Sequence, residues 1–472
     1  MKLLIDVPKL YPAERDYILS VLFCEFLGLE IQIERSERHN VKISAYDDCE
    51  LIIADGLFAV SPEFWLKPDS LPHQPLKIWN IDSAPIKATT VNTKVPVIYG
   101  HNPESAGFFE VTEKRINWGL DIFGSAFFML TRYEEFVNLH LDSRERFLGR
   151  YSLAYQESFL DRPIVNEYLE LLWAALTILW PTLQRKSREY KVMLTHDVDV
   201  PFATIGIPKK FVLRSMGADL LLRRDPSLAW RRVKSFFKIR HGDHTLDPNN
   251  TFNSIMDLSE KHGLISHFYF IAGHSAGDLD GFYSIDDPFI RTLMKQIYLR
   301  GHEIGLHPSY NSFQEPECIH REFEKLIRVA DEEGIQQSRW GGRQHYLRWK
   351  VPTTWQAWED AGLDYDSTLS FIDVAGFRCG TCYEFSVFNL MTKKQLQLKE
   401  YPLIVMDITL FCQMNMPQVE SLSLMQRLAQ RCKIFNGIFV FLWHNNSWLR
   451  YDNSGEFYIQ AVKTSIYPDQ VD

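Results

Sequence analysis

Cysteine is scarce in this sequence, and the seven cysteines are scattered over 472 residues. A small secreted domain stapled by disulfides would carry a dense and even set. Cys379 and Cys382 have the spacing of a redox or metal pair, but no second pair stands at a matching distance, so we interpret them as packing residues of a loop. The pattern favours a reducing compartment, and we expect a cytoplasmic protein.

Long hydrophobic runs are also missing. A membrane-spanning helix needs about 18 or more consecutive apolar residues, and the stretch 171–180 is roughly half that length, so it predicts a buried helix. At the N-terminus, Asp6 and Pro8 interrupt the apolar residues before the core of a signal peptide could form. We therefore expect no membrane span and no export by that route.

The sequence lacks an excess of positive charge. Its net charge of -9 comes from 60 acidic and 51 basic residues, so the whole chain has no electrostatic footprint for nucleic acid. The insertion 208–240 is a local exception, because lysine and arginine alternate there with aromatic and aliphatic residues. Such a helical segment could lie peripherally on an anionic membrane surface or meet a phosphate-bearing substrate, whereas a solvated basic helix with one buried face is the simpler interpretation.

The composition that remains is that of a soluble globular protein, with 46% hydrophobic and 24% charged residues. The length suits two or three domains. Residues 1–100 mix helical and β-rich stretches and predict a small α/β domain of unknown role, and residues 101–185 predict a helical bridging segment. From 186 to 472 strands alternate with helices, which is typical of a parallel sheet, either closed as a barrel or doubly wound.

The alternation in this last region is regular. Asp287 is placed to cap a helix that ends at Gly301, and Pro288 suits its first turn. The expected strands are 191–195, 267–271 and 438–443. The expected helices are 252–262, 288–300, 319–333, 353–361 and 420–432.

Polar residues follow several of these strands. Asp197 and Asp199 follow the first, His307 closes a later one, and His444 follows the last. Reactive groups gather where parallel strands end. Carboxylates and imidazoles at such positions are what a hydrolytic metal site needs: ligands for a divalent ion, a base and an acid. His302 alone is more simply a structural hydrogen-bonding residue.

These segments resemble the motifs of the polysaccharide deacetylase family, of the NodB-homology or carbohydrate esterase 4 type. The matching stretches are 195–199, 301–311, 343–346 and 442–444, in the family's order and at its approximate spacing. The resemblance covers residues 186–472 and implies a distorted (β/α) barrel. It also implies a hydrolase that removes an acetyl group from an N-acetylated or O-acetylated sugar or polysaccharide intermediate.

The same resemblance assigns catalytic roles. Asp197 would be the general base, with Arg343 keeping it ionised, and His444 would protonate the leaving group. Either Asp366 or Asp407 would orient His444 by accepting its ring proton, and Asp366 is preferred because it lies where the family's fourth motif falls.

The implied cofactor is one divalent metal, with zinc expected and cobalt, nickel or manganese as alternatives. Asp199 and His307 would be ligands. The family's second metal aspartate is replaced by Val198, and its second metal histidine by Asn311. Asn311 is a weak third ligand through its amide oxygen.

His345, which stands where the family has proline, and His196 are stronger third ligands in chemical type. Tyr346, near a backbone amide that would stabilise the oxyanion, and Trp443 are the expected substrate-binding residues. Two alternatives remain open at this point. One is a catalytically silent relative that binds glycans, and the other is a metal-dependent amidase acting on a substrate other than sugar.

Overall fold

The computed structural model of the chain describes residues 1–203, 209–221, 224–238, 246–451 and 455–470. The chain forms two compact units. The first unit comprises Met1–Lys191, Leu369–Ile404 and Gln430–Ile438, and the second comprises Val192–Thr368, Val405–Ala429 and Phe439–Asp472. The divisions at residues 100 and 185 stay predictions of the sequence.

The first unit is built on a mixed sheet with the strand order β2-β1-β3-β4-β8-β7. The strands of this sheet are β1 (Leu3–Pro8), β2 (Ile31–Ser36), β3 (Asn40–Ser44), β4 (Glu50–Ala54), β7 (Phe109–Val111) and β8 (Arg115–Trp118). The first unit also contains β5 (Lys77–Asn80), β6 (Lys94–Val97), β14 (Phe385–Asn389) and β15 (Lys394–Glu400). β1 pairs with β2 and β4 with β8 in parallel, whereas β3 runs antiparallel to both β1 and β4. β5 with β6, and β14 with β15, form antiparallel pairs.

The helices of the first unit are α1 (Pro12–Leu19), α2 (Ile122–Leu130), α3 (Tyr133–Val137), α4 (Leu153–Gln156) and α5 (Ile164–Leu179). Asp121 starts α2, because its side chain accepts a hydrogen bond from the Gly124 N–H at 2.8 Å. Its other oxygen accepts from the N–H groups of Gly56 and Leu57, which follow β4. α5 contains most of the apolar stretch 171–180, and its side chains are largely buried, as that stretch predicted.

The strands of the second unit are β9 (Lys191–Val198), β10 (Ser266–Ile271), β11 (Glu303–His307), β12 (Gly341–Gly342), β13 (Tyr365–Asp366), β16 (Val405–Met406) and β17 (Ile438–Leu442). They follow the order β13-β12-β11-β10-β9-β17-β16. The registers of β9 with β10, β10 with β11 and β16 with β17 are parallel, as are those of β12 with its two neighbours. The expected mixed α/β fold with a parallel sheet is therefore confirmed.

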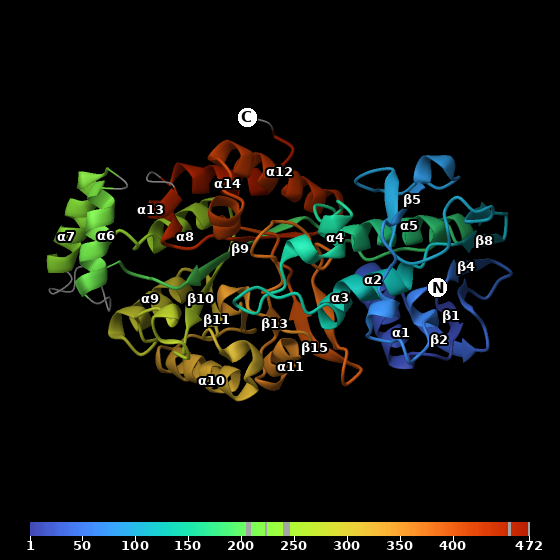
Figure 1. Cartoon of the computed structure of the whole chain (residues 1–472), viewed down its shortest axis with the longest axis horizontal. Coiled ribbons are helices and arrows are strands. Elements are labelled where there is room, and N and C mark those ends of the chain that lie inside the picture. The colour runs from blue at the N-terminus through green and yellow to red at the C-terminus, as the bar shows by residue number, and fades with distance from the viewer. Residues whose placement is uncertain (204–208, 222–223, 239–245, 452–454, 471–472) are drawn as a thin grey trace. The chain divides into compact units, whose positions relative to one another are not determined.

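The helices of the second unit are α6 (Lys209–Leu221), α7 (Pro226–Lys238), α8 (Phe252–Lys261), α9 (Pro288–Leu299), α10 (Pro316–Glu332), α11 (Thr353–Asp360), α12 (Gln418–Ile434, of which 430–434 group with the first unit), α13 (Ser447–Tyr451) and α14 (Glu456–Ile466). α8 packs against β10, α9 and α10 against β11, and α11 against β13 (Figure 1). This cover explains why β10 is buried along its whole length.

The expected cap of α9 is wrong in one respect. Asp287 precedes the helix, but its side chain makes no cap; it accepts a hydrogen bond from the Ser284 N–H at 2.8 Å instead. Pro288 does occupy the first turn, and Gly301 follows the helix end with a φ of 82°. Among the described residues no helix is both long enough and apolar enough to cross a membrane.

The carboxyl ends of these parallel strands bring distant residues to one edge of the sheet. β11 and β12 approach very closely, since a Cβ atom on Gly342 would clash with the Leu306 carbonyl oxygen. The N–H of Arg343, the next residue, donates to that carbonyl at 3.1 Å. A glycine at 342 therefore sets Arg343 beside the end of β11.

Candidate active site

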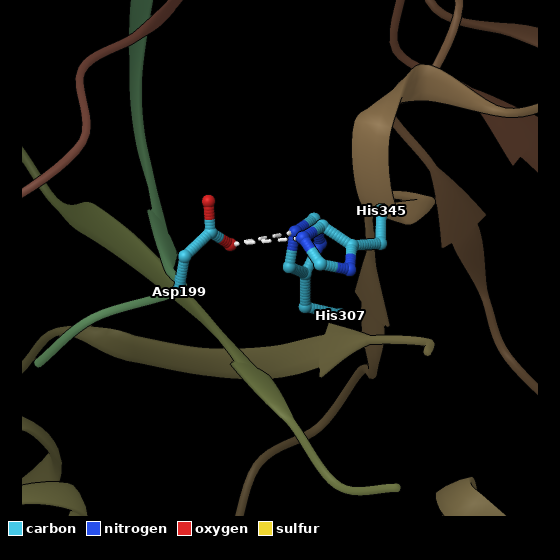
Figure 2. Close-up of side chains that lie close together, drawn as sticks. All are labelled: Asp199, His307 and His345. Carbon is cyan, nitrogen blue, oxygen red and sulfur yellow. Dashed lines mark ion pairs between the residues drawn. The ribbon is translucent and has the colours of Figure 1, made fainter. Parts of the chain in front are cut away.

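Three side chains at this edge form a group that could hold a metal ion: Asp199, His307 and His345. Their ligand atoms all lie within 4.8 Å of one another. Oδ1 of Asp199 is 3.2 Å from Nε2 of His307 and 3.5 Å from Nε2 of His345. Figure 2 shows this carboxylate oxygen directed at the two imidazoles, with dashed lines marking both contacts.

The opposite nitrogens of the two imidazoles are held by acceptors. Nδ1 of His307 donates to the Arg343 carbonyl oxygen at 2.6 Å, and Nδ1 of His345 lies 3.2 Å from a carboxylate oxygen of Asp280. With Nδ1 held by an acceptor, Nε2 is the ring nitrogen that faces Asp199 in both histidines. Without a metal ion, an Nε2–H can donate to the Asp199 carboxylate, and loss of that proton would leave a lone pair for a metal ion.

The donor set of one carboxylate and two imidazoles fits a divalent cation. Oδ1 of Asp199 is buried and has no hydrogen-bond partner, although two imidazole nitrogens face it. Ligand atoms around a tetrahedral zinc at the usual bond lengths stand about 3.3 Å from one another, close to both Asp199 contacts. The Asp199 side chain keeps 27% of its surface exposed, so solvent reaches the group from one side.

Asp197 and Arg343 form a buried ion pair beside the three ligands, at 2.9 Å between Oδ1 and Nη1. The guanidinium also donates to the Thr195 hydroxyl and to the backbone and side chain of Ser367. The second carboxylate oxygen of Asp197 lies 3.9 Å from Nε2 of His307. This contact holds the Asp197 carboxylate next to the candidate ligands. The expected role of Arg343, to keep Asp197 ionised, stays a prediction.

His444 lies on another side of Asp199, with Nε2 3.7 Å from its Oδ2. Its Nδ1 is 2.8 Å from Oδ1 of Asp407, and the backbone N–H of His444 donates to the other oxygen of the same carboxylate. The preference for Asp366 as the orienting carboxylate is therefore wrong. Asp366 accepts instead from the backbone and hydroxyl of Thr368, because the chain turns back at the end of β13.

Asn311 is not part of the ligand group. Its side-chain amide donates to the Ser275 carbonyl at 3.1 Å, and its oxygen accepts from Arg348 at 3.2 Å. These contacts direct the Asn311 side chain to Ser275 and Arg348, so its role as third ligand stays a prediction, and His345 is the residue that groups with Asp199 and His307. His196 is excluded, since its ring nitrogens contact the Trp443 carbonyl and the Ser266 hydroxyl.

The two expected substrate-binding residues differ in their surroundings. Trp443 is fully buried, and its ring stacks on Phe457 at 5.6 Å, so the expectation that it touches substrate is wrong and it belongs to the core. Tyr346 is half-buried, and its ring lies 4.6 Å from that of His345. Its φ of 59° is unusual for a residue with a side chain, and its role in substrate binding stays a prediction.

The ionisation states match this arrangement. Desolvation opposes the charge on Asp199, but the imidazoles of His345 and His307 outweigh it and lower the pKa of this carboxyl. Burial also opposes protonation of His444, yet the Asp407 carboxylate raises its pKa to about 10. His444 therefore holds its proton at neutral pH while Asp199 stays ionised.

Asp280 was missed by the sequence analysis. Its side chain is fully buried and accepts hydrogen bonds from the N–H groups of Ser275, Ala276 and Tyr310 as well as facing His345. Burial opposes its charge, but the hydrogen bonds to His345 and the backbone lower its pKa to about 2. The only signal in the sequence is its position in the polar loop after the strand 266–271, where it competes with Asp278.

Comparisons with known proteins give distant likenesses. Residues 3–181 match the model of a family of unknown function, DUF7033. No curated protein matches the chain. Among solved structures, the chain is similar to one described as a candidate polysaccharide deacetylase from Mycobacterium smegmatis. The identity is 13% over 60% of this chain and 86% of that chain, with a TM-score of 0.39.

Two further solved structures are similar to the chain. One is a mutant of a CE4-family pseudoenzyme with restored enzymatic activity, at 12% identity over 59% of this chain and 61% of that chain, with a TM-score of 0.28. The other is an allantoinase, at 11% identity over 59% of this chain and 85% of that chain, with a TM-score of 0.35. At these scores the likenesses are too distant to carry an argument about activity.

Proposed function

We propose that this chain is a metal-dependent hydrolase that removes an acetyl group from an acetylated sugar. The observation that carries the proposal is the placement of a carboxylate, Asp197, and a protonated imidazole, His444, beside the same group of candidate metal ligands. A binding protein has no need of a base and an acid at one site. This argues for an enzyme over a silent glycan-binding relative.

The finer features are part of the same proposal. The parallel sheet of the second unit would belong to a distorted (β/α) barrel of the polysaccharide deacetylase type. Asp199, His307 and His345 would hold one divalent ion, with zinc first and cobalt, nickel or manganese as alternatives. Bound there, the ion would polarise the acetyl carbonyl and lower the pKa of water.

The protein's own groups account for the proton transfers. Asp197 takes a proton from the water whose oxygen attacks the acetyl carbon, and Arg343 holds this carboxylate in place by a hydrogen bond. The bond from the carbonyl carbon to the sugar nitrogen or oxygen then breaks. His444 gives its Nε2 proton to the departing amine or alkoxide, while Asp407 holds Nδ1. The products are acetate and the free amine or alcohol.

An acetylated sugar is proposed as the substrate because of the sequence motifs, since Asp197, His307, Arg343 and His444 stand where the deacetylase motifs place their counterparts. Tyr346 would lie beside the substrate, next to His345. The same catalytic groups could serve an amide other than that of a sugar, so the substrate has to be tested separately from the chemistry.

The test combines metal content with acetate release. The purified chain should contain near one equivalent of divalent metal by elemental analysis, and Asp199→Ala and His307→Ala should lose it. The metal-loaded protein should release acetate from N-acetylglucosamine oligomers or from acetylated xylan. His444→Ala should keep the metal and lose acetate release, by a factor of about 10² to 10⁴.

Each part of the proposal can fail separately. No metal after incubation with zinc, cobalt, nickel and manganese would refute the metal site and favour the silent relative. A metal-loaded protein that is inert on acetylated sugars but cleaves simple acyl amides would refute the substrate and retain the hydrolase.

A further inference from the structure

α6 and α7 form a helical hairpin, which we call the basic hairpin (Lys209–Leu221 and Pro226–Lys238) (Figure 1). An ion pair between Asp219 and Arg232, at 2.8 Å and nearly without exposure, holds the two helices together. Residues 208, 222–223 and 239–240 of the insertion 208–240 lie outside the described residues.

The basic hairpin presents large apolar side chains to solvent. Five of them expose between 51% and 80% of their surface: Leu213, Leu220, Leu221, Trp230 and Phe237. An apolar groove of about 270 Å³ runs between the two helices, lined by Val212, Leu213, Met216, Val233, Phe236 and Phe237. Isolated exposed apolar residues are ordinary, but a cluster of this kind on two short helices marks an interaction surface.

The exposed charge of the basic hairpin and of the turn before α7 is mainly positive. The exposed cations among the described side chains are Lys210, Arg214, Arg231, Lys234 and Lys238 in the two helices and Arg224 in the turn. Of the two acidic residues, Asp219 is paired with Arg232, and Asp225 in the turn accepts hydrogen bonds at the start of α7. The chain as a whole carries a net charge of -9, so this positive surface is a local feature.

The hairpin is attached beside the candidate active site. The Phe211 ring packs against the Phe282 ring at 5.5 Å. Two residues close to Phe282 in the chain contact the candidate active site. Asp280 faces His345, and the Tyr283 hydroxyl donates to the carbonyl oxygen of Val198, which precedes Asp199, at 2.7 Å. The short segment 280–283 therefore contacts both the base of the hairpin and the ligand group.

We propose that the basic hairpin docks the protein on a membrane surface that contains anionic phospholipid. The exposed leucine, tryptophan and phenylalanine side chains would enter the boundary between headgroups and acyl chains, and the surrounding lysines and arginines would lie against the lipid phosphates. Interfacial helices that bind anionic lipid combine these two features. Docking there places the ligand group near the membrane, where an amphiphilic substrate would be found.

Charge complementarity favours a membrane over a second copy of this chain. A second acidic copy would satisfy some of the cations, but an interface between copies would leave positive charges facing each other across any symmetric contact through the hairpin. The inference does not depend on the proposed hydrolase activity, because docking is measured without turnover.

The test is a vesicle flotation assay on the full chain. We expect the protein to float with vesicles of phosphatidylcholine and phosphatidylglycerol, to release at high salt, and to stay behind with phosphatidylcholine alone. The double variant Arg231→Glu, Lys234→Glu should weaken binding by well over an order of magnitude, since each basic residue near an anionic surface contributes about a five-fold factor. Lys9→Glu, Lys114→Glu in the first unit is the matched control and should bind as the unchanged protein does.

A second variant tests the apolar contribution. Leu220→Ser, Leu221→Ser, Trp230→Ser changes exposed side chains that do not line the groove between the helices, so the circular dichroism spectrum should be unchanged while vesicle binding falls. Absence of binding to anionic vesicles would overturn the proposal, and so would binding that both hairpin variants retain. A dimer in vesicle-free solution that this triple variant converts to monomers would overturn it in favour of a contact between copies.

Discussion

Oδ1 of Asp280 lies 3.2 Å from Nδ1 of His345, and the Asp280 carboxylate also accepts from three backbone N–H groups and the Ser275 hydroxyl. The aspartate is thus fixed by the fold, and it fixes the imidazole in turn. Carboxylates of this kind set the orientation and the protonated nitrogen of a ligating histidine.

Replacing Asp280 with asparagine should therefore weaken metal binding. The expected loss of zinc affinity is about 10- to 100-fold, the usual effect of removing a partner behind a ligand. Titration calorimetry on metal-free protein measures it. Asp278→Asn is the matched control, because Asp278 is exposed in the same loop. Equal affinities in the two variants would mean that Asp280 does not position His345.

His345 and Asn311 give opposite expectations for the third ligand. His345→Ala should lose the metal, since it removes one of the three ligand atoms. Asn311→Ala should keep it, since the asparagine side chain is engaged by Ser275 and Arg348. Elemental analysis after dialysis against a weak chelator distinguishes them. The reverse outcome would restore the ligand set that the sequence motifs indicate.

The carboxylate behind His444 can be identified by two isosteric changes. Asp407→Asn should lower kcat by about 10² to 10⁴, because the amide cannot stabilise the protonated imidazole. Asp366→Asn should have little effect, since burial raises the pKa of Asp366 to about 7 and the carboxyl is already partly neutral. Acetate release gives both values. A large loss in the Asp366 variant alone would contradict the assignment.

Protonation of a buried histidine should make stability depend on pH. Burial lowers the pKa of His196 to about 3 in the folded chain, against about 6.5 when unfolded. Between these values the unfolded state binds one more proton, so the free energy of unfolding falls as the pH decreases from about 6.5 to about 3. The slope is at most about 1.4 kcal/mol per pH unit.

His196→Gln should remove this contribution to the slope. The measurement is urea unfolding at pH 7 and pH 5, and the quantity compared is the difference between the two free energies. His320→Gln is the control, because His320 is exposed on α10. An unchanged difference in the His196 variant would mean that the ring titrates normally in the folded chain.

The sequence by itself determined that the candidate catalytic and metal-binding residues lie together at one edge of the parallel sheet. Asp197, Asp199, His307 and His444 end or follow buried strands, and parallel strands bring their carboxyl ends to one edge whatever the loops do. The pairing of Arg343 with Asp197 follows from the same rule. The periodicities also predicted the helices 288–300 and 319–333. The glycines that follow them, Gly301 and Gly334, adopt a positive φ, which suits a helix end.

Only the tertiary structure decided how the loop side chains are used. His345 groups with the candidate ligands Asp199 and His307, Asp407 replaces Asp366 behind His444, and Asp280 contacts His345 from a loop. Sequence spacing does not fix the direction of a side chain in a turn, which depends on backbone angles such as the φ of 59° at Tyr346. The surroundings of Trp443 were also decided by the tertiary structure. Its ring packs against Phe457 and Tyr458 of α14 in the core, and the sequence gives no sign of these contacts.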